Sequence, residues 1–385
     1  MDDACDFLEH AWEAEKAYDL AGAERHYEKC LALAPDFARA WLTYGAMLLK
    51  LRRFDEALQA LEHAENSPDE RRHAYFISGQ VYFEQNMWPE AEQAFRSSLA
   101  LQRTTYAHVY LGVTLANAKR STEAIESYKA ALEIDPNFDE AHYNLGVEYH
   151  IAKDDNNAVL HFRRAIAIDP NYGIAYAQLG KLLGGLAHKN EDKLREARHL
   201  LETATHFEPN DGWSRLYLAN LCWRLCDNRA AERHYIAAIK ILPTLGITHQ
   251  CYAEFLAAKS DDRELMRFHV DRAIELDPQK AGWVYRLGSR LMRWHRRGEA
   301  EYYLKRAHEL GYTTAKVVLD RLDEYIPKQD HWQICAECGT PLEPRNKWWC
   351  SECGTDLRIK KCQERYEYRS IKREYAQQFE TLLPR

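Results

Sequence analysis

Four cysteines near the end of the chain have the spacing of a metal site. Cys335 and Cys338 form one Cys-x-x-Cys pair and Cys350 and Cys353 form another, with eleven residues between the pairs. Two such turns can present four thiolates tetrahedrally, and a glycine follows each pair where the turn needs an unhindered backbone. We expect one bound metal ion, zinc in preference to iron, because nothing else in the sequence suggests electron transfer.

This metal site is expected to be structural. A catalytic zinc ion keeps one position open for water, whereas four thiolates fill the coordination shell. A segment of about 25 residues forms no stable core unaided, so the metal would supply most of its folding free energy. Arg345, Lys347, Trp348 and Trp349 could stack on nucleic-acid bases or dock the segment onto the rest of the chain. The four acids in residues 331–357 favour docking.

The chain before this segment repeats every 34 residues. From Pro136, Gly146 is ten residues further, Ala158 is twelve further again, and Pro170 follows after another twelve. Such small residues let two antiparallel helices approach closely, and the proline ends the second helix of each pair. The large residues four positions after the alanine are expected to pack against the following unit. They include Phe95, Tyr128, Phe162 and Tyr235.

This pattern resembles the tetratricopeptide repeat (TPR) family. The resemblance implies an all-α fold, a right-handed solenoid of about nine helix-turn-helix repeats over residues 4–312. We expect a capping helix and linker at 313–330, with residues 315–326 closing the stack. The cysteine pairs are similar to a zinc ribbon or rubredoxin-type knuckle, expected at 331–358, and a basic amphipathic helix is expected at 359–385.

The TPR resemblance implies a concave groove, lined by the first helix of each repeat, that holds extended peptides or partner helices. The residues expected there combine aromatic rings with amides, which suits recognition of a peptide. They are Tyr106, Tyr110, Tyr143, Asn144, Gln178, Lys181, Trp213, Tyr217, Asn220, Trp223 and Tyr285. The simpler interpretation is that several of these rings only pack between adjacent repeats.

One known form of TPR groove is not expected. The clamp for acidic chaperone carboxyl termini needs lysine, arginine and asparagine on three successive first helices. Asn144 matches the central position, but the flanking positions are occupied by other residue types. They are Val109, Val113, Ile174 and Gln178.

The order of repeats followed by a four-cysteine knuckle resembles the bacterial lipopolysaccharide assembly protein B family. That family has an amino-terminal membrane helix. This chain begins MDDACDFLEHAWEAEKAYDL, with no basic segment before an apolar core, and no stretch approaches the roughly 20 apolar residues of a membrane helix. We therefore expect a cytoplasmic protein in which repeats and knuckle cooperate as an adaptor.

The end of the chain differs in charge from the rest. Residues 358–385 contain eight Lys or Arg against four Asp or Glu, a local charge of +4 in a chain of net charge −7. Ile371, Tyr375, Phe379 and Leu382 follow each other at helical spacing there. This segment could bind a partner, an anionic membrane surface or RNA, or fold onto the solenoid.

These observations give two functional hypotheses. The first is a non-enzymatic scaffold that holds a protein or peptide partner in its groove. The alternative is a nucleic-acid-associated protein that acts through the knuckle and the basic tail. An enzyme is not expected, since no phosphate-binding glycine loop, nucleophile elbow or histidine-rich metal motif appears. His142, His161, His199 and His234 are expected at the surface or in packing, and the sequence does not fix the oligomeric state.

Overall fold

The computed structural model confirms an all-helical body. It describes residues 2–188, 190–259, 262–280, 282–293, 296–320, 333–334 and 341–342. Within these ranges the chain forms nine consecutive helix pairs, followed by one shorter helix and two short strands. The prediction of about nine helix-turn-helix units is therefore confirmed for the described part of the chain. None of the described helices is long and apolar enough to cross a membrane.

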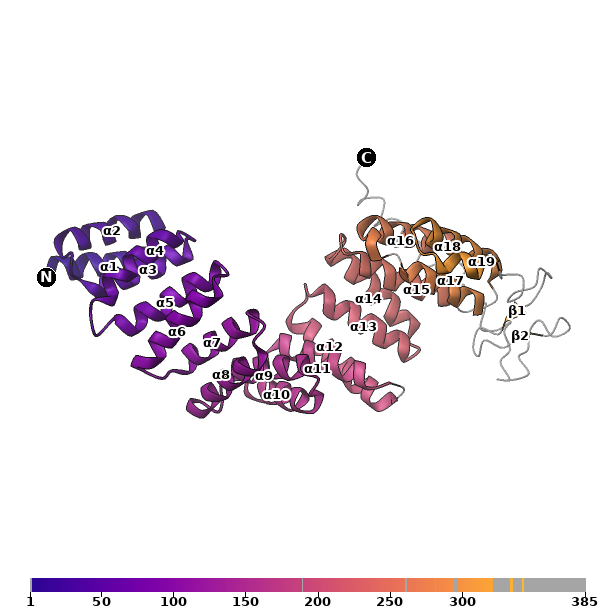
Figure 1. Cartoon of the computed structure of the whole chain (residues 1–385), viewed down its shortest axis with the longest axis horizontal. Helices are drawn as coiled ribbons and strands as arrows, with labels where there is room; N and C mark the ends of the chain where they lie inside the picture. The colour runs from indigo at the N-terminus through magenta and orange to yellow at the C-terminus, as the bar shows by residue number, and fades with distance from the viewer. Residues whose placement is uncertain are drawn as a thin grey trace. The chain divides into compact units, whose positions relative to one another are not determined.

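Each pair consists of an odd-numbered first helix and an even-numbered second helix (Figure 1). The bounds are α1 (Asp2–Lys16) and α2 (Leu20–Leu33), α3 (Ala38–Lys50) and α4 (Phe54–Glu65), α5 (Arg71–Glu84) and α6 (Trp88–Leu101), α7 (Thr105–Asn117) and α8 (Ser121–Ile134), α9 (Asp139–Ile151) and α10 (Asp155–Ile168), α11 (Gly173–Leu186) and α12 (Glu191–Phe207), α13 (Gly212–Arg224) and α14 (Asn228–Ile241), α15 (Gly246–Lys259) and α16 (Arg263–Leu276), and α17 (Gly282–Arg293) and α18 (Arg297–Glu309). A 3-10 turn, η1 (Pro278–Lys280), lies between α16 and α17.

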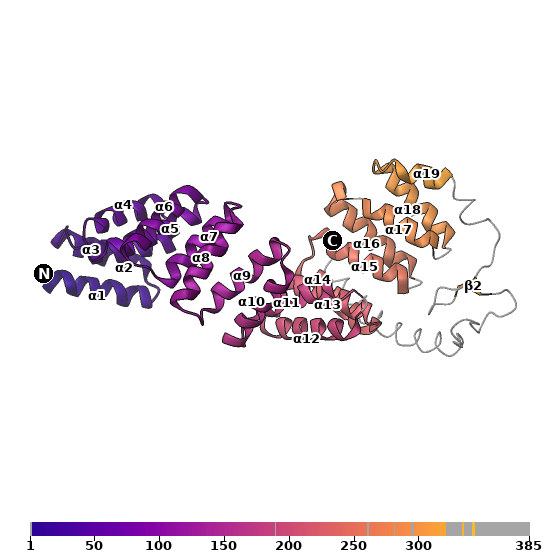
Figure 2. The same ribbon diagram turned by 60° about the horizontal axis from the view of Figure 1, so that its bottom comes forward.

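The chain divides into two compact units, residues 1–217 and 218–385, and the division falls inside α13. In the first unit each second helix from α2 to α10 packs against its own first helix and against the first helix of the next pair (Figure 1). The first helices also touch one another, α5 against α7 and α7 against α9. In the second unit α15 packs on α16 and α17 on α18 (Figure 2).

A shorter helix, α19 (Thr314–Asp320), packs against α18. It matches the first part of the closing helix expected at residues 315–326, and the last six residues of that prediction lie outside the described residues. The strands β1 (Gln333–Ile334) and β2 (Pro341–Leu342) pair in an antiparallel manner, with Gln333 opposite Leu342 and Ile334 opposite Pro341.

Glycines hold the two helices of a pair close together. A β-carbon added to Gly79 would lie 2.6 Å from the ring of Phe95, and one added to Gly146 would lie 2.7 Å from the ring of Phe162. Carbon atoms in contact are about 3.5–4.0 Å apart, so no larger residue fits without movement. The ring of Phe95 also lies 5.6 Å from that of Tyr110 in the next pair. The expected contact with the following unit is confirmed, but the ring packs on the glycine of its own pair as well.

The turn between the two helices places a residue in the left-handed backbone region in the first seven pairs. Seven such turns in the described chain have a positive φ at a residue that is not glycine. The residues are Tyr18, Arg52, Asn86, Lys119, Lys153, His188 and Cys226. A side chain in this conformation costs roughly 1 kcal/mol, so packing of the helix pair determines the turn against local preference.

At the junction between two helix pairs, the carbonyl oxygen of the repeat proline accepts a hydrogen bond. The side chain six residues after the proline donates a hydrogen bond to that carbonyl oxygen in several repeats, as Trp41 Nε1 does to Pro35 at 2.7 Å and Arg215 Nη2 does to Pro209 at 3.1 Å. The contact satisfies a carbonyl that would otherwise have no partner at the end of the second helix. In these repeats the bond ties the first helix to the end of the helix that precedes it.

Candidate partner-binding face of the first helices

One face of four successive first helices in the first unit carries most of the residues predicted to bind a partner. We call this surface, on α7, α9, α11 and the start of α13, the first-helix face. Its members are Tyr106, Tyr110, Tyr143, Asn144, Gln178, Lys181, Trp213 and Tyr217. Three of them are exposed, with Tyr106 at 60% and Trp213 at 45% of their surface and Lys181 also exposed. The others are half-buried.

The two tyrosines of α7 have different surroundings. The ring of Tyr106 meets the ring of Phe138 edge-on at 5.1 Å and remains open to solvent on its other side. Tyr110 lies among Phe76 and Phe95 at centroid distances of 5.4 and 5.6 Å. The packing interpretation therefore describes Tyr110 better, whereas Tyr106 offers a free ring.

Tyr143 and Gln178 come together from neighbouring first helices. The ring of Tyr143 lies 5.3 Å from that of Tyr172 and 5.9 Å from that of Phe162. Burial raises the pKa of Tyr143, and a hydrogen bond with the Gln178 side chain opposes this effect. Asn144, the next residue on α9, is half-buried. The α9–α11 step thus presents a phenol and two amides, which are groups that can bond to a peptide backbone.

The last group of residues on the first-helix face lies on α11 and α13. It consists of Lys181, Tyr217 and Trp213. The Nζ atom of Lys181 lies 5.1 Å from the centroid of the Tyr217 ring, within the range of a cation–π interaction. The rings of Trp213 and Tyr217 are nearly parallel, with centroids 6.5 Å apart. The structure therefore brings these three predicted residues together.

Comparison with known proteins agrees with this geometry. The family model for the tetratricopeptide repeat matches residues 14–76, a second model with the same description matches residues 139–172, and a model for the TPR repeat matches residues 119–150. The chain carries tetratricopeptide repeats. No curated protein sequence matches the chain.

The chain is also similar to several solved structures. The human IFIT1 dimer with PPP-AAAA is 17% identical at a TM-score of 0.51, and the match covers 83% of this chain and 82% of that chain. PilF of Pseudomonas aeruginosa is 19% identical at a TM-score of 0.49, covering 55% and 94%. MamA is 22% identical at a TM-score of 0.40, covering 44% and 93%. The IFIT1 likeness supports the tetratricopeptide repeat fold and nothing beyond it.

In the second unit, the residues predicted to bind a partner contact other side chains of the same unit. The hydroxyl of Tyr235 donates a hydrogen bond of 2.6 Å to Oδ1 of Asn220. Trp223 meets Phe255 edge-on at 5.8 Å. The ring of Tyr285 stacks on the ring of Tyr312 at 5.0 Å. All three predicted residues are half-buried, so packing accounts for much of their surface in this unit.

Three residues that the sequence analysis did not select belong to the first-helix face. Phe138 and Tyr172 lie two residues after Pro136 and Pro170, and their rings contact Tyr106 and Tyr143 as described above. Glu140 is exposed on the first turn of α9. The recurrence of an aromatic residue two positions after the repeat proline was the signal that could have revealed the first two.

Histidines in the tetratricopeptide repeats pair across the two helices of a repeat. His142 Nδ1 lies 3.0 Å from His161 Nδ1, and His142 Nε2 lies 3.2 Å from the Pro136 carbonyl. His249 and His269 repeat this geometry at 2.8 Å. Burial lowers the pKa of His161 to about 4 and that of His269 to about 3, so both rings are neutral near pH 7. The packing role predicted for His142 and His161 is confirmed.

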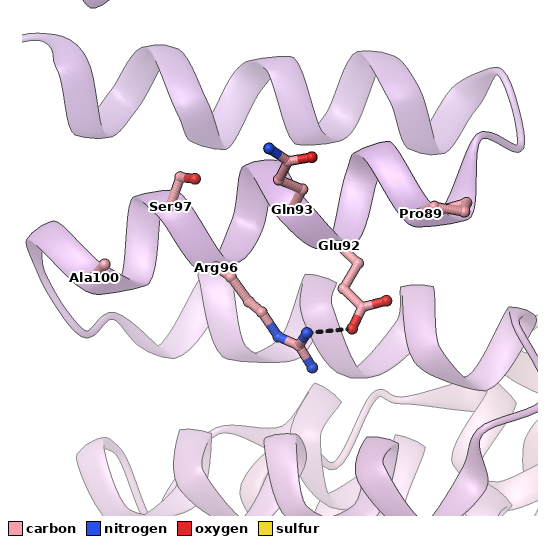
Figure 3. A pocket seen from close by; sticks show the side chains of 6 residues that line it. All are labelled: Pro89, Glu92, Gln93, Arg96, Ser97 and Ala100. Atoms are coloured by element: carbon pink, nitrogen blue, oxygen red, sulfur yellow. Dashed lines mark ion pairs between the residues drawn. The ribbon is translucent and has the colours of Figure 1, made fainter.

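A surface depression on α6 does not gather catalytic groups. Its volume is about 480 Å³, and its lining comes from one helix (Figure 3). The lining residues are Pro89, Glu92, Gln93, Arg96, Ser97 and Ala100. Glu92 and Arg96 are joined by an ion pair of 2.6 Å. Within the described ranges, no group of three or more His, Cys, Asp or Glu is placed to hold a metal ion.

The predicted metal ligands and tail lie outside the described residues. They are Cys335, Cys338, Cys350 and Cys353, the contact residues Arg345, Lys347, Trp348 and Trp349, and residues 359–385. The described strands β1 and β2 flank the first cysteine pair in the sequence.

Proposed function

We propose that this protein is a non-enzymatic, cytoplasmic adaptor that binds a segment of a partner protein on the first-helix face. The observation that carries this proposal is the exposure of large rings at the two ends of the first-helix face, on α7 and α13. Tyr106 keeps 60% and Trp213 keeps 45% of its surface exposed, although each lies beside another ring of the face. Rigid aromatic rings give large contact area at low entropic cost.

The second contact module is proposed to be the four-cysteine segment. Strands β1 and β2 pair on either side of Cys335 and Cys338, which supports a knuckle, because a hairpin brings the ends of the intervening loop together. With Cys350 and Cys353, four thiolates would hold one structural zinc ion. The order of repeats and knuckle, which resembles the lipopolysaccharide assembly protein B family, supports an adaptor with two contact regions.

The test of the first-helix face uses photo-crosslinking in the full chain. A photoreactive phenylalanine analogue replaces Tyr106, and the crosslinked proteins are recovered and compared between the parent chain and the Trp213→Ala and Tyr143→Ala variants. We expect defined protein partners whose yield falls at least fivefold in both variants. Tyr18→Ala is the control, because Tyr18 is 90% exposed and lies in the turn between α1 and α2.

An unchanged yield in folded Trp213→Ala protein would contradict the proposal. Circular dichroism must show intact helices, since Tyr143 packs on two rings and its removal also weakens the repeat. The nucleic-acid alternative rests on residues 335–385. It predicts retention of RNA on a filter near 50 mM salt that falls steeply as salt rises.

A further inference from the structure

We propose that the first-helix face selects extended partner segments in which a lysine or arginine lies between two apolar residues. This inference rests on the partner-binding role proposed above and specifies the chemistry of the partner. It is carried by a row of three exposed residues, by an unpaired pair of carboxylates and by the rings beside them.

The row consists of Tyr106, Glu140 and Ile174, which are 34 residues apart and therefore occupy the same position on α7, α9 and α11. All three are exposed, Tyr106 by 60% and Ile174 by 48% of their surface. The face thus presents one acid between an aromatic and an aliphatic side chain. A segment lying across the three helices would meet apolar, acidic and apolar groups in that order.

The spacing of the helices sets the spacing of the partner residues. First helix α7 touches first helix α9 directly, and packed helices have axes about 8–10 Å apart. A partner segment in the extended polyproline II conformation advances roughly 3.1 Å per residue with three residues per turn, so residues three apart lie on the same side and span about one step. The expected partner motif is an apolar residue, a basic residue three positions later, and an apolar residue three positions after that.

The start of α9 carries two adjacent acids. Asp139 and Glu140 adjoin each other on α9, and neither forms an ion pair with another described residue. Loss of surrounding water and the charge of Asp139 raise the pKa of Glu140. Burial raises the pKa of Tyr172, and nearby acidic groups raise it further. These groups are Glu140, Tyr143, Asp139 and Asp169. Burial is the larger cause of both shifts, the neighbouring acids add to it, and a bound cation would oppose the added part.

The rings beside these carboxylates suit the same partner group. Tyr143 lies on α9 with Glu140, and Tyr172, whose ring is 5.3 Å from that of Tyr143, immediately precedes α11, which carries Ile174. A guanidinium or ammonium group gains from a carboxylate and from an aromatic face together. The lysine on this face, Lys181, already lies over the ring of Tyr217. The chemistry is the reverse of a clamp for acidic carboxyl termini.

The experiment selects peptides on the full-length protein from a phage-displayed library of random dodecapeptides. The parent chain should enrich sequences with Lys or Arg three residues from an apolar residue. Glu140→Lys should remove this enrichment and weaken a synthetic peptide from the parent selection roughly tenfold. Glu126→Lys is the matched control, because Glu126 is an exposed acid on α8, a second helix, and the same charge change there should leave selection unchanged.

Each outcome decides a different claim. Enrichment of basic peptides that Glu140→Lys abolishes and Glu126→Lys retains supports the inference. Enrichment of peptides without basic residues, or basic enrichment that survives Glu140→Lys in protein with parental helicity, overturns the inference but leaves the partner-binding role standing. Failure to enrich any peptide overturns both.

Discussion

Gly112 and Tyr128 fit together so closely that a β-carbon on the glycine would lie 2.5 Å from Cε1 of the ring. Gly112→Ala should therefore lower the free energy of unfolding by about 1–3 kcal/mol, because the buried ring must move. Urea denaturation followed by circular dichroism measures this change. Gly185→Ala is the control, since a β-carbon there meets nothing within 4 Å and alanine favours the helix. Equal effects of the two substitutions would contradict the close packing.

The turn between α7 and α8 predicts a stabilising substitution. Lys119 has a φ of 66°, a conformation that glycine adopts without steric cost. Lys119→Gly should raise the free energy of unfolding by about 1 kcal/mol. Lys119→Ala should change it by less than about 0.5 kcal/mol, because alanine keeps the β-carbon. A destabilised glycine variant would show that this backbone conformation is not adopted in solution.

The histidine pair of α15 and α16 predicts stability that depends on pH. Burial holds the pKa of His269 at about 3, below its usual 6.5, so the unfolded chain binds a proton below about pH 6.5 that the folded chain does not. Stability should fall as the pH falls from 6.5 toward 3, with this residue contributing up to about 1.4 kcal/mol per pH unit. Urea denaturation between pH 7.5 and 5 measures the slope.

His269→Leu should reduce that slope by the share of His269 and leave the share of His161, while His199→Leu should leave the slope unchanged, because His199 is exposed on α12. A slope that is identical in His269→Leu and the parent chain would mean that the buried pair is not the source of the effect.

The cysteine segment predicts one zinc ion per chain. Mass spectrometry of the metal content should find zinc in the purified full-length protein, and Cys335→Ser or Cys350→Ser should remove most of it. Cys5→Ser should retain the metal, since Cys5 is an exposed free cysteine on α1. Iron with the absorption of a thiolate complex, or no metal at all, would contradict the zinc assignment.

The repeat could be predicted from the sequence, but the set of residues that forms the first-helix face could not. Gly146, Ala158 and Pro170 predict a helix pair because each small residue and each proline acts through local sterics. Met266 occupies the place of the repeat alanine in α16 and is nevertheless buried, so packing accommodates a larger residue there. Gly180 and Ala197 are 17 residues apart, five more than Gly146 and Ala158, and the pair of α11 and α12 still forms.

The surroundings of individual rings depend on neighbours 15 to 34 residues away in the sequence. Tyr106 and Tyr110 lie one helical turn apart, and both were predicted to bind a partner. Only the positions of Phe76, Phe95 and Phe138 show that Tyr110 is enclosed while Tyr106 is open. Glu140 was overlooked because an exposed acid in the first turn of a helix is common, and its unpaired state is visible only in three dimensions.

Hydrogen–deuterium exchange of the full-length protein, with and without a peptide selected on it, tests the first-helix face most directly. The account predicts that the peptide slows exchange in α7, α9 and α11 and leaves α8, α10 and α12 unchanged. Protection confined to those second helices, or located wholly in residues 218–320, would contradict the assignment of the first-helix face as the site where the partner binds.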